Sequence, residues 1–230
     1  GVSFVDYARS TGSIQGCRAR LIPALRQLVD GVSALHRRGK LHRDIKPSNV
    51  LVTPGGRVVI LDFGLIAELT PYAGERRYVS GGTPAYMAPE EVSGARPSEA
   101  ADWYGIGVTL YEALTETIPF ADSAGELLRH KLTMDPPSPV ELSPDVPSDL
   151  TAICMGLLCR DPERRLSGPA ALRQLDRETL APVMDTTSVA MRDAPFVGRD
   201  GQLRVLNAAF RAVTGGSGAA VCVSGPSGIG

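Results

Sequence analysis

The feature that most constrains the fold is a pair of polar segments that flank a short apolar hairpin. The first segment, His42–Asn49, has the sequence His-Arg-Asp-Ile-Lys-Pro-Ser-Asn and follows a predicted helix of about Arg18–Arg38. The β-prone runs Val50–Val52 and Val58–Leu61 come next, separated by Thr-Pro-Gly-Gly, which is a strong turn sequence. The second polar segment, Asp62–Gly64, has the sequence Asp-Phe-Gly and ends the second strand. The sequence therefore predicts a helix, a polar loop and a hairpin in that order, with a carboxylate on either side of the hairpin.

These two segments resemble the catalytic loop and the metal-binding motif of protein kinases of the eukaryotic-like (Hanks-type) bacterial serine/threonine class. In that family one carboxylate accepts or orients the proton of the attacking hydroxyl, while an amide oxygen and a second carboxylate hold Mg²⁺ against the phosphates of ATP. The resemblance implies that Asp44 is the base and that Lys46 neutralises charge on the transferred phosphoryl group. It also implies that Asn49 and Asp62 hold the magnesium, and that Leu51 joins them in binding the cofactor.

Each segment taken alone has a simpler interpretation. His42–Asn49 is also compatible with a polar turn, and Asp62–Gly64 with an ordinary strand end. Their occurrence together, in this order and with a hairpin between them, favours the kinase interpretation.

A third segment, Gly82–Glu90, has the sequence Gly-Thr-Pro-Ala-Tyr-Met-Ala-Pro-Glu and closes a long irregular stretch that begins at Leu65. It resembles the substrate-docking segment at the end of a kinase activation loop, in the form typical of the serine/threonine branch. Lys46, two residues after the predicted base, points to the same branch. The resemblance implies that Thr83 bridges towards Asp44 and Lys46, and that the substrates are serine and threonine hydroxyls of proteins.

Three further residues are implied to have structural roles. In the family a glutamate equivalent to Glu90 pairs with a buried arginine, which Arg165 matches; a buried carboxylate without its cation is costly, so we expect a structural pair. Asp102 opens an almost wholly apolar predicted helix, Ala101–Leu114, and matches the aspartate that accepts backbone hydrogen bonds from the catalytic loop. The alternative for Asp102 is a simple acidic residue at a helix N-terminus.

Arg43 matches the arginine that in many family members pairs with a phosphate on the activation loop. Regulation by phosphorylation is therefore a hypothesis, with Ser80 as the nearest candidate and Tyr78 and Thr70 as others. Ordinary loop polarity is the alternative explanation for each of these hydroxyls.

The phosphate clamp of a complete kinase is absent from this sequence. No G-x-G-x-x-G segment starts a strand pair, and none of the lysines lies in a strand of V-A-I-K type. The chain begins with Gly1 rather than Met, and Gly1–Tyr7 resembles the stretch just after the hinge between the kinase lobes. The resemblance thus covers about Gly1–Leu175, the C-terminal lobe. We expect the chain to lack the N-terminal lobe, to bind ATP weakly or not at all by itself, and to be inactive alone.

The last part of the chain resembles the start of a P-loop ATPase of the AAA or STAND type. Phe196–Arg199 precedes a predicted helix of about Gly201–Val213, and an apolar strand, Ala219–Val223, follows. The G-x-x-x-x-G spacing comes next, and the phosphate-binding lysine and hydroxyl would fall beyond the last residue. A glycine-rich turn is the alternative. The P-loop glycines would be Gly225, Gly228 and Gly230.

We therefore predict an α+β protein with three parts. Residues 1–176 form a mainly helical kinase C-terminal lobe with a small β-hairpin, residues 177–194 a linker, and residues 195–230 the beginning of an α/β P-loop domain. The remaining predicted helices of the lobe are Gly125–Leu132, Ser148–Leu158 and Pro169–Leu175.

Composition excludes several other classes. With 43% hydrophobic and 21% charged residues the chain is typical of globular proteins, and a net charge of −1 without basic runs does not suggest nucleic-acid binding. No apolar run reaches the length of a membrane span and no signal peptide is evident, so we expect a cytoplasmic location. The four cysteines have no paired spacing and are expected to be reduced thiols.

Three functional hypotheses remain at this point. The first is an enzyme, a kinase that transfers the γ-phosphoryl group of ATP. The second is a binding module, a pseudokinase that regulates the downstream ATPase domain. The third is that the ATPase is the main activity and that the kinase lobe regulates it. The presence of Asp44, Asn49 and Asp62 together favours the enzyme, because pseudokinases commonly lose at least one of these residues.

Overall fold

The structure is a computed structural model that describes residues 1–179 except 13, 63–66, 69–82, 97 and 122. The chain divides into two compact units, Gly1–Pro182 and Val183–Gly230, and all described residues belong to the first unit. The predicted P-loop domain, most of the predicted linker and the candidate phosphorylation sites Ser80, Tyr78 and Thr70 lie outside the described residues.

Helix α2 (Ile14–His36) supplies one wall of the core. The apolar residues Leu21, Leu25, Leu28, Val32 and Leu35 recur at helical spacing; the first four are fully buried, whereas Leu35 is half-buried. The helix begins four residues before the predicted start, so Pro23 lies inside it and not in its first turns. A proline there removes one backbone hydrogen bond, and burial of the apolar stripe offsets that loss.

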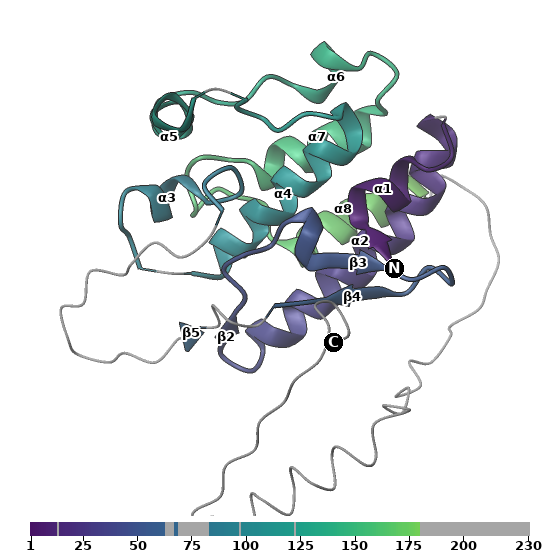
Figure 1. Ribbon diagram of the computed structural model, residues 1–230, viewed down its shortest axis with the longest axis horizontal. Helices are drawn as coiled ribbons and strands as arrows, with labels where there is room; N and C mark the ends of the chain where they lie inside the picture. The colour runs from purple at the N-terminus through teal and green to yellow at the C-terminus, as the bar shows by residue number, and fades with distance from the viewer. Residues whose placement is uncertain (13, 63–66, 69–82, 97, 122, 180–230) are drawn as a thin grey trace, which may run out of the picture. The chain divides into compact units, whose positions relative to one another are not determined.

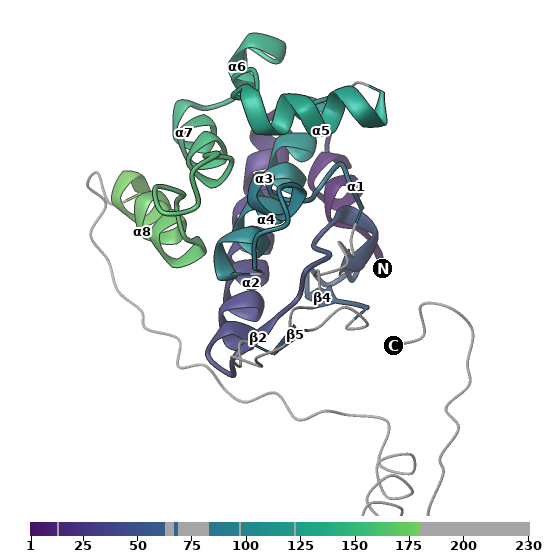
Figure 2. The same cartoon turned by 90° about the vertical axis from the view of Figure 1, so that its left-hand side faces the viewer.

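Helix α4 (Glu99–Thr115) is buried along almost its whole length, which confirms the prediction of a helix surrounded by protein. It contacts α1 (Phe4–Arg9) and α7 (Ser148–Leu157), and Figure 2 shows it between those two helices. Helix α8 (Gly168–Thr179) packs against α2 and α7 and continues into the first residues of the predicted linker. The core therefore lies around α4.

The strands lie along one side of the helices, at their lower edge in Figure 1. The predicted hairpin is present: β3 (Val50–Val52) pairs antiparallel with β4 (Val58–Ile60), with Val50 opposite Ile60. Strand β1 (Val2–Ser3) adds to the free edge of β3, and β2 (Lys40–Leu41) pairs with β5 (Ala67–Glu68). The hairpin is fixed to α2 because the Gln27 side chain accepts from Val58 N at 3.1 Å and donates to Gly56 O at 2.9 Å.

Three more short α-helices lie in the described part of the chain. Helix α5 (Ala124–Thr133) follows its prediction, whereas α3 (Pro89–Val92) and α6 (Pro139–Leu142) were not predicted. Each of these one-turn helices begins with a proline. In each, a glutamate side chain accepts a hydrogen bond from the backbone N–H of the residue that directly precedes the helix. They are too short to show helical periodicity.

Two other expectations concern the cysteines and membrane-spanning helices. Cys17, Cys154 and Cys159 are free thiols, as predicted. Among the helices of the described part of the chain, none is both long enough and apolar enough to cross a bilayer.

Candidate active site

The loop that carries Asp44 is held by one buried carboxylate from helix α4. Asp102 accepts hydrogen bonds from the backbone N–H of His42 at 2.9 Å and of Arg43 at 2.7 Å. Its Oδ2 also lies 2.8 Å from Nε2 of His36, at the end of α2. These bonds hold Arg43 at φ 68°, a left-handed conformation that non-glycine residues rarely adopt. Asp102 thus stabilises a backbone conformation of the loop that is unfavourable by itself.

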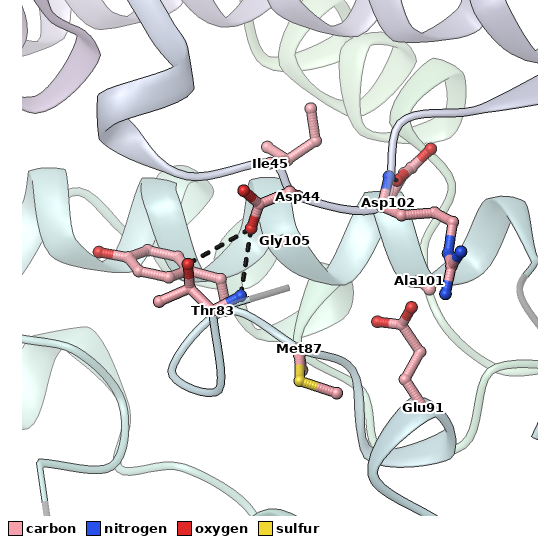
Figure 3. A pocket seen from close by; sticks show the side chains of 10 residues that line it. Asp44, Ile45, Thr83, Met87, Glu91, Ala101, Asp102 and Gly105 are labelled. Atoms are coloured by element: carbon pink, nitrogen blue, oxygen red, sulfur yellow. Dashed lines mark hydrogen bonds between the residues drawn. The ribbon is translucent and has the colours of Figure 1, made fainter. Parts of the chain in front are cut away.

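A glycine in α4 lets the loop approach the helix closely. A Cβ atom added to Gly105 would lie 3.1 Å from the carbonyl oxygen of Ile45, directly after Asp44. Figure 3 shows Ile45 and Asp44 above this part of the helix. Any larger residue at position 105 would push the Asp44 loop away from α4.

The Asp44 carboxylate is surrounded by hydrogen-bond donors. Lys46 Nζ lies 2.7 Å from its Oδ2 and Asn49 Nδ2 lies 2.9 Å from the same atom. Thr83 donates from its backbone N–H to Oδ1 at 3.1 Å and from its hydroxyl at 3.4 Å, the two dashed lines of Figure 3. Burial raises the pKa of Asp44, but these donors outweigh it and hold the pKa below its ordinary value. Asp44 is therefore ionised at neutral pH.

Lys46 and Thr83 are bound to each other as well as to Asp44. Lys46 Nζ donates to Thr83 Oγ1 at 2.7 Å. The three side chains form a closed triangle in which the ammonium contacts both the carboxylate and the hydroxyl. The segment that resembles a docking segment is thereby fixed to the loop that carries Asp44.

Asn49 and the strand end before Asp62 are joined through the backbone. Leu61 N donates to Asn49 O at 2.8 Å, so the two candidate metal ligands come from adjacent positions in the fold. Asn49 uses its amide N–H groups on Asp44, which leaves its amide oxygen for a metal. Asp62 is exposed and has φ 59°. One amide oxygen and one carboxylate are ligands that suit Mg²⁺, so these residues fit such an ion.

Glu90 and Arg165 form a bidentate ion pair. Arg165 Nη1 lies 2.5 Å from Glu90 Oε1 and Nη2 lies 2.7 Å from Oε2. The guanidinium also donates to the carbonyl oxygens of Cys159 and Ala100, at 2.8 Å each. The Arg165 side chain is completely buried, so this pair ties the end of the Thr83 segment to the body of the protein.

Comparison with known proteins agrees with this geometry. The protein kinase domain family matches residues 1–175. The chain belongs to the protein kinase family. It is 39% identical over 152 residues to the serine/threonine-protein kinase AtPK2/AtPK19 of Arabidopsis thaliana, an alignment that covers 66% of the chain and 31% of that relative.

Bacterial serine/threonine kinases are also among the relatives. The kinase domain is 37% identical over 169 residues to Pkn1 of Myxococcus xanthus, covering 70% of the chain and 24% of Pkn1. It is 33% identical over 153 residues to PknL of Mycobacterium tuberculosis, covering 66% of the chain and 38% of PknL. The chain thus spans between 24% and 38% of the length of these three curated relatives.

The other predicted residues of the kinase domain are placed as follows. Leu51 is half-buried in the middle of β3. Arg43 lines a small cavity with Glu91 of α3 and Asp102, and the last two are labelled in Figure 3. Ser80 and the predicted P-loop glycines Gly225, Gly228 and Gly230 lie outside the described residues.

Sequence reasoning missed several residues around the Thr83 segment. The Tyr86 hydroxyl donates to Glu112 of α4 at 2.7 Å, and burial, followed by this carboxylate, raises the pKa of Tyr86. Lys131 of α5 donates to two carbonyl oxygens of the segment. A signal for Lys131 was available, because its i+4 spacing from the buried Leu127 puts it on the inward face of α5.

Proposed function

We propose that the full-length protein is a serine/threonine kinase that transfers the γ-phosphoryl group of ATP to serine and threonine hydroxyls of protein substrates. The observation that carries this proposal is the Asp44 carboxylate, which is kept ionised by Lys46, Asn49 and Thr83. A carboxylate can accept a hydroxyl proton only when it is ionised, and it must lie beside the segment that binds the substrate.

In this proposal each group has a distinct role. Asp44 orients the substrate hydroxyl and takes its proton as the bond from the hydroxyl oxygen to the γ-phosphorus forms and the bond to the ADP oxygen breaks. Lys46, which contacts Asp44, would neutralise charge on the transferred group. Asn49 and Asp62 would hold Mg²⁺, which when bound neutralises the phosphate oxygens. Leu51 would contact the nucleotide.

The same proposal extends to the parts of the chain around the site. We keep residues 1–176 as the kinase C-terminal lobe, 177–194 as a linker and 195–230 as the start of a P-loop domain with Gly225, Gly228 and Gly230 at its phosphate loop. A cytoplasmic location and phosphorylation at Ser80, read by Arg43, also stay predictions. Weak ATP binding by the 230-residue chain alone is a further prediction, which isothermal calorimetry tests directly.

The test of the proposed function is Asp44→Asn in the full-length protein. The amide preserves the shape of the side chain but cannot accept a proton, so transfer of radiolabelled phosphate to a serine- and threonine-containing peptide library should fall by about 10²- to 10⁴-fold. The matched control is Asp145→Asn, an exposed aspartate far along the chain, which should leave the rate unchanged. Transfer by Asp44→Asn at the wild-type rate would show that Asp44 is not the base.

A further inference from the structure

Lys131 is a buried cation that none of the kinase motifs includes. It lies in the last turn of α5 and is only 2% exposed. Its ammonium donates to Ala85 O at 2.7 Å and to Met87 O at 2.6 Å. Burial of an ammonium group is costly unless its N–H groups are satisfied, so these carbonyl oxygens are the partners that allow Lys131 to be inside.

The third neighbour of the ammonium is an aromatic ring from the centre of the core. Lys131 Nζ lies 4.9 Å from the ring centroid of Tyr104, which is fully buried in α4. The Arg165 guanidinium carbon lies 5.0 Å from the same centroid. Lys131 thus joins three elements: its own helix α5, the rigid helix α4 and the backbone at Ala85 and Met87.

The two carbonyl groups belong to a short stretch that is fixed at other points as well. Thr83 is bound to Asp44 at the start of this stretch, and the Tyr86 hydroxyl is bound to Glu112. Lys131 donates hydrogen bonds to the carbonyl oxygens of the residues on either side of Tyr86. The backbone from Thr83 to Met87 is therefore held from one end by the Asp44 loop and from the other by Lys131.

We propose that Lys131 is a positioning residue for the protein substrate, whose ammonium fixes the backbone of residues 83–87 in the shape that presents a substrate hydroxyl to Asp44. The proposal rests on the proposed kinase function. Lys131 acts through the docking segment and does not touch ATP or the transferred group, so its loss should weaken the use of the peptide and leave the use of ATP intact.

The experiment measures steady-state kinetics of the full-length protein at pH 6, where Lys131 carries its proton, with the best peptide from a serine- and threonine-containing library. In Lys131→Met, which keeps the length of the side chain without its donors, KM for the peptide should rise about tenfold, as expected for the loss of charge-assisted hydrogen bonds. KM for ATP should stay within about twofold, because no hydrogen bond of the Asp44 loop is removed. Lys131→Gln, which keeps two N–H donors without the charge, should give an intermediate peptide KM.

Arg129→Met is the matched control, because it removes an exposed cation two residues away on the same helix. It should leave both KM values unchanged. An unchanged peptide KM in folded Lys131→Met, or an equal rise in both KM values, would overturn the proposal. If Lys131→Met does not fold, Lys131→Gln decides in its place, and a peptide KM equal to that of the wild type would overturn it.

A second measurement separates this proposal from the proposed function. If the wild-type protein transfers phosphate to no peptide, the kinase proposal fails, and limited chymotrypsin digestion then tests Lys131 alone. Cleavage after Tyr86 should be about tenfold faster in Lys131→Met or Lys131→Gln than in the wild type and in Arg129→Met, because the open population of the segment grows as its hydrogen bonds are lost. Equal cleavage rates would overturn the positioning role.

Discussion

Arg165 and Lys131 are two buried cations that lie against the same ring, Tyr104, yet they stabilise the region around it in different ways. Arg165 faces a carboxylate that it binds with two parallel hydrogen bonds. Among the described residues the hydrogen-bond partners of Lys131 are neutral carbonyl oxygens, and the carboxylates of Glu90 and Glu91 act on it through space. The first cation is hydrogen-bonded to an opposite charge, and the second is hydrogen-bonded to carbonyl dipoles.

The difference appears in the charge state of the two groups. Burial lowers the pKa of Lys131 to about 7, and the attraction of Glu91 and Glu90 opposes this only in part. A guanidinium keeps its proton under all ordinary conditions. The Arg165 contact is therefore permanent, whereas the Lys131 contact changes its character within the physiological pH range.

The largest effect is expected when Glu90, the hydrogen-bonded carboxylate partner of Arg165, is removed. Glu90→Ala leaves a completely buried guanidinium without its counter-charge, so the free energy of unfolding should fall by about 3–5 kcal/mol. Urea denaturation followed by tryptophan fluorescence measures this, since Trp103 is buried next to Tyr104 in α4. Glu163→Ala, at an exposed position, serves as control. A loss of less than 1 kcal/mol would mean that Arg165 is satisfied by carbonyl groups in the way Lys131 is.

A smaller effect is expected when Arg165 is made chemically similar to Lys131. Arg165→Lys keeps the charge but loses the planar fork that binds both oxygens of Glu90, so unfolding should become easier by about 1.5–3 kcal/mol. The same denaturation experiment measures it. Stability equal to that of the wild type would show that the charge of Arg165 matters and its geometry does not.

Per pH unit, the smallest effect is a pH dependence of the free energy of unfolding that belongs to Lys131. Between pH 7 and the ordinary lysine pKa of 10.5 the unfolded chain carries a proton on Lys131 that the folded protein lacks. Unfolding then takes up a proton, so the stabilising contribution is present above this window and is lost as the pH falls towards 7. Relative to Lys131→Met, the wild-type free energy of unfolding should rise by about 1.4 kcal/mol per pH unit at most across the window.

Denaturation midpoints of the two proteins at pH 6, 7, 8 and 9 test this slope, with Arg129→Met to remove the general effect of losing a cation. Parallel pH profiles for the wild type and Lys131→Met would show that Lys131 keeps its ordinary pKa, and that the distinction from Arg165 does not hold.

Much of the fold could be predicted because its strongest signals are local. The apolar run of α4 and the Thr-Pro-Gly-Gly turn of the β3–β4 hairpin each specify one element without reference to the rest of the chain. The pairing of β2 with β5 could not be predicted, because each strand has only two residues and the partners are distant in sequence. The early start of α2 was missed because its first turns contain Gly16 and show no clear apolar periodicity.

In the candidate site, too, the residues of one local motif could be predicted and those that depend on distant partners could not. Asp44 and Asn49 lie in one short motif, so the sequence alone places them together. Lys131 is separated from Ala85 and Met87 by more than forty residues, and a lysine on an amphipathic helix is in most proteins a solvated residue. The spacing from Leu127 indicates that Lys131 faces inward, but the carbonyl groups that it binds become its partners only when α5 packs against residues 85–87.

The hydrogen bonds between Asp102 and the Asp44 loop have a consequence for how a substrate hydroxyl would bind. Ordering a loop on ligand binding takes about 1–2 kcal/mol of conformational entropy per residue from the affinity. Here the backbone N–H groups of His42 and Arg43 are fixed by a side chain of the central helix, so their order is acquired when the core forms. A substrate hydroxyl arriving at Asp44 would meet a loop that is already ordered, so none of its binding energy would be spent on ordering these residues.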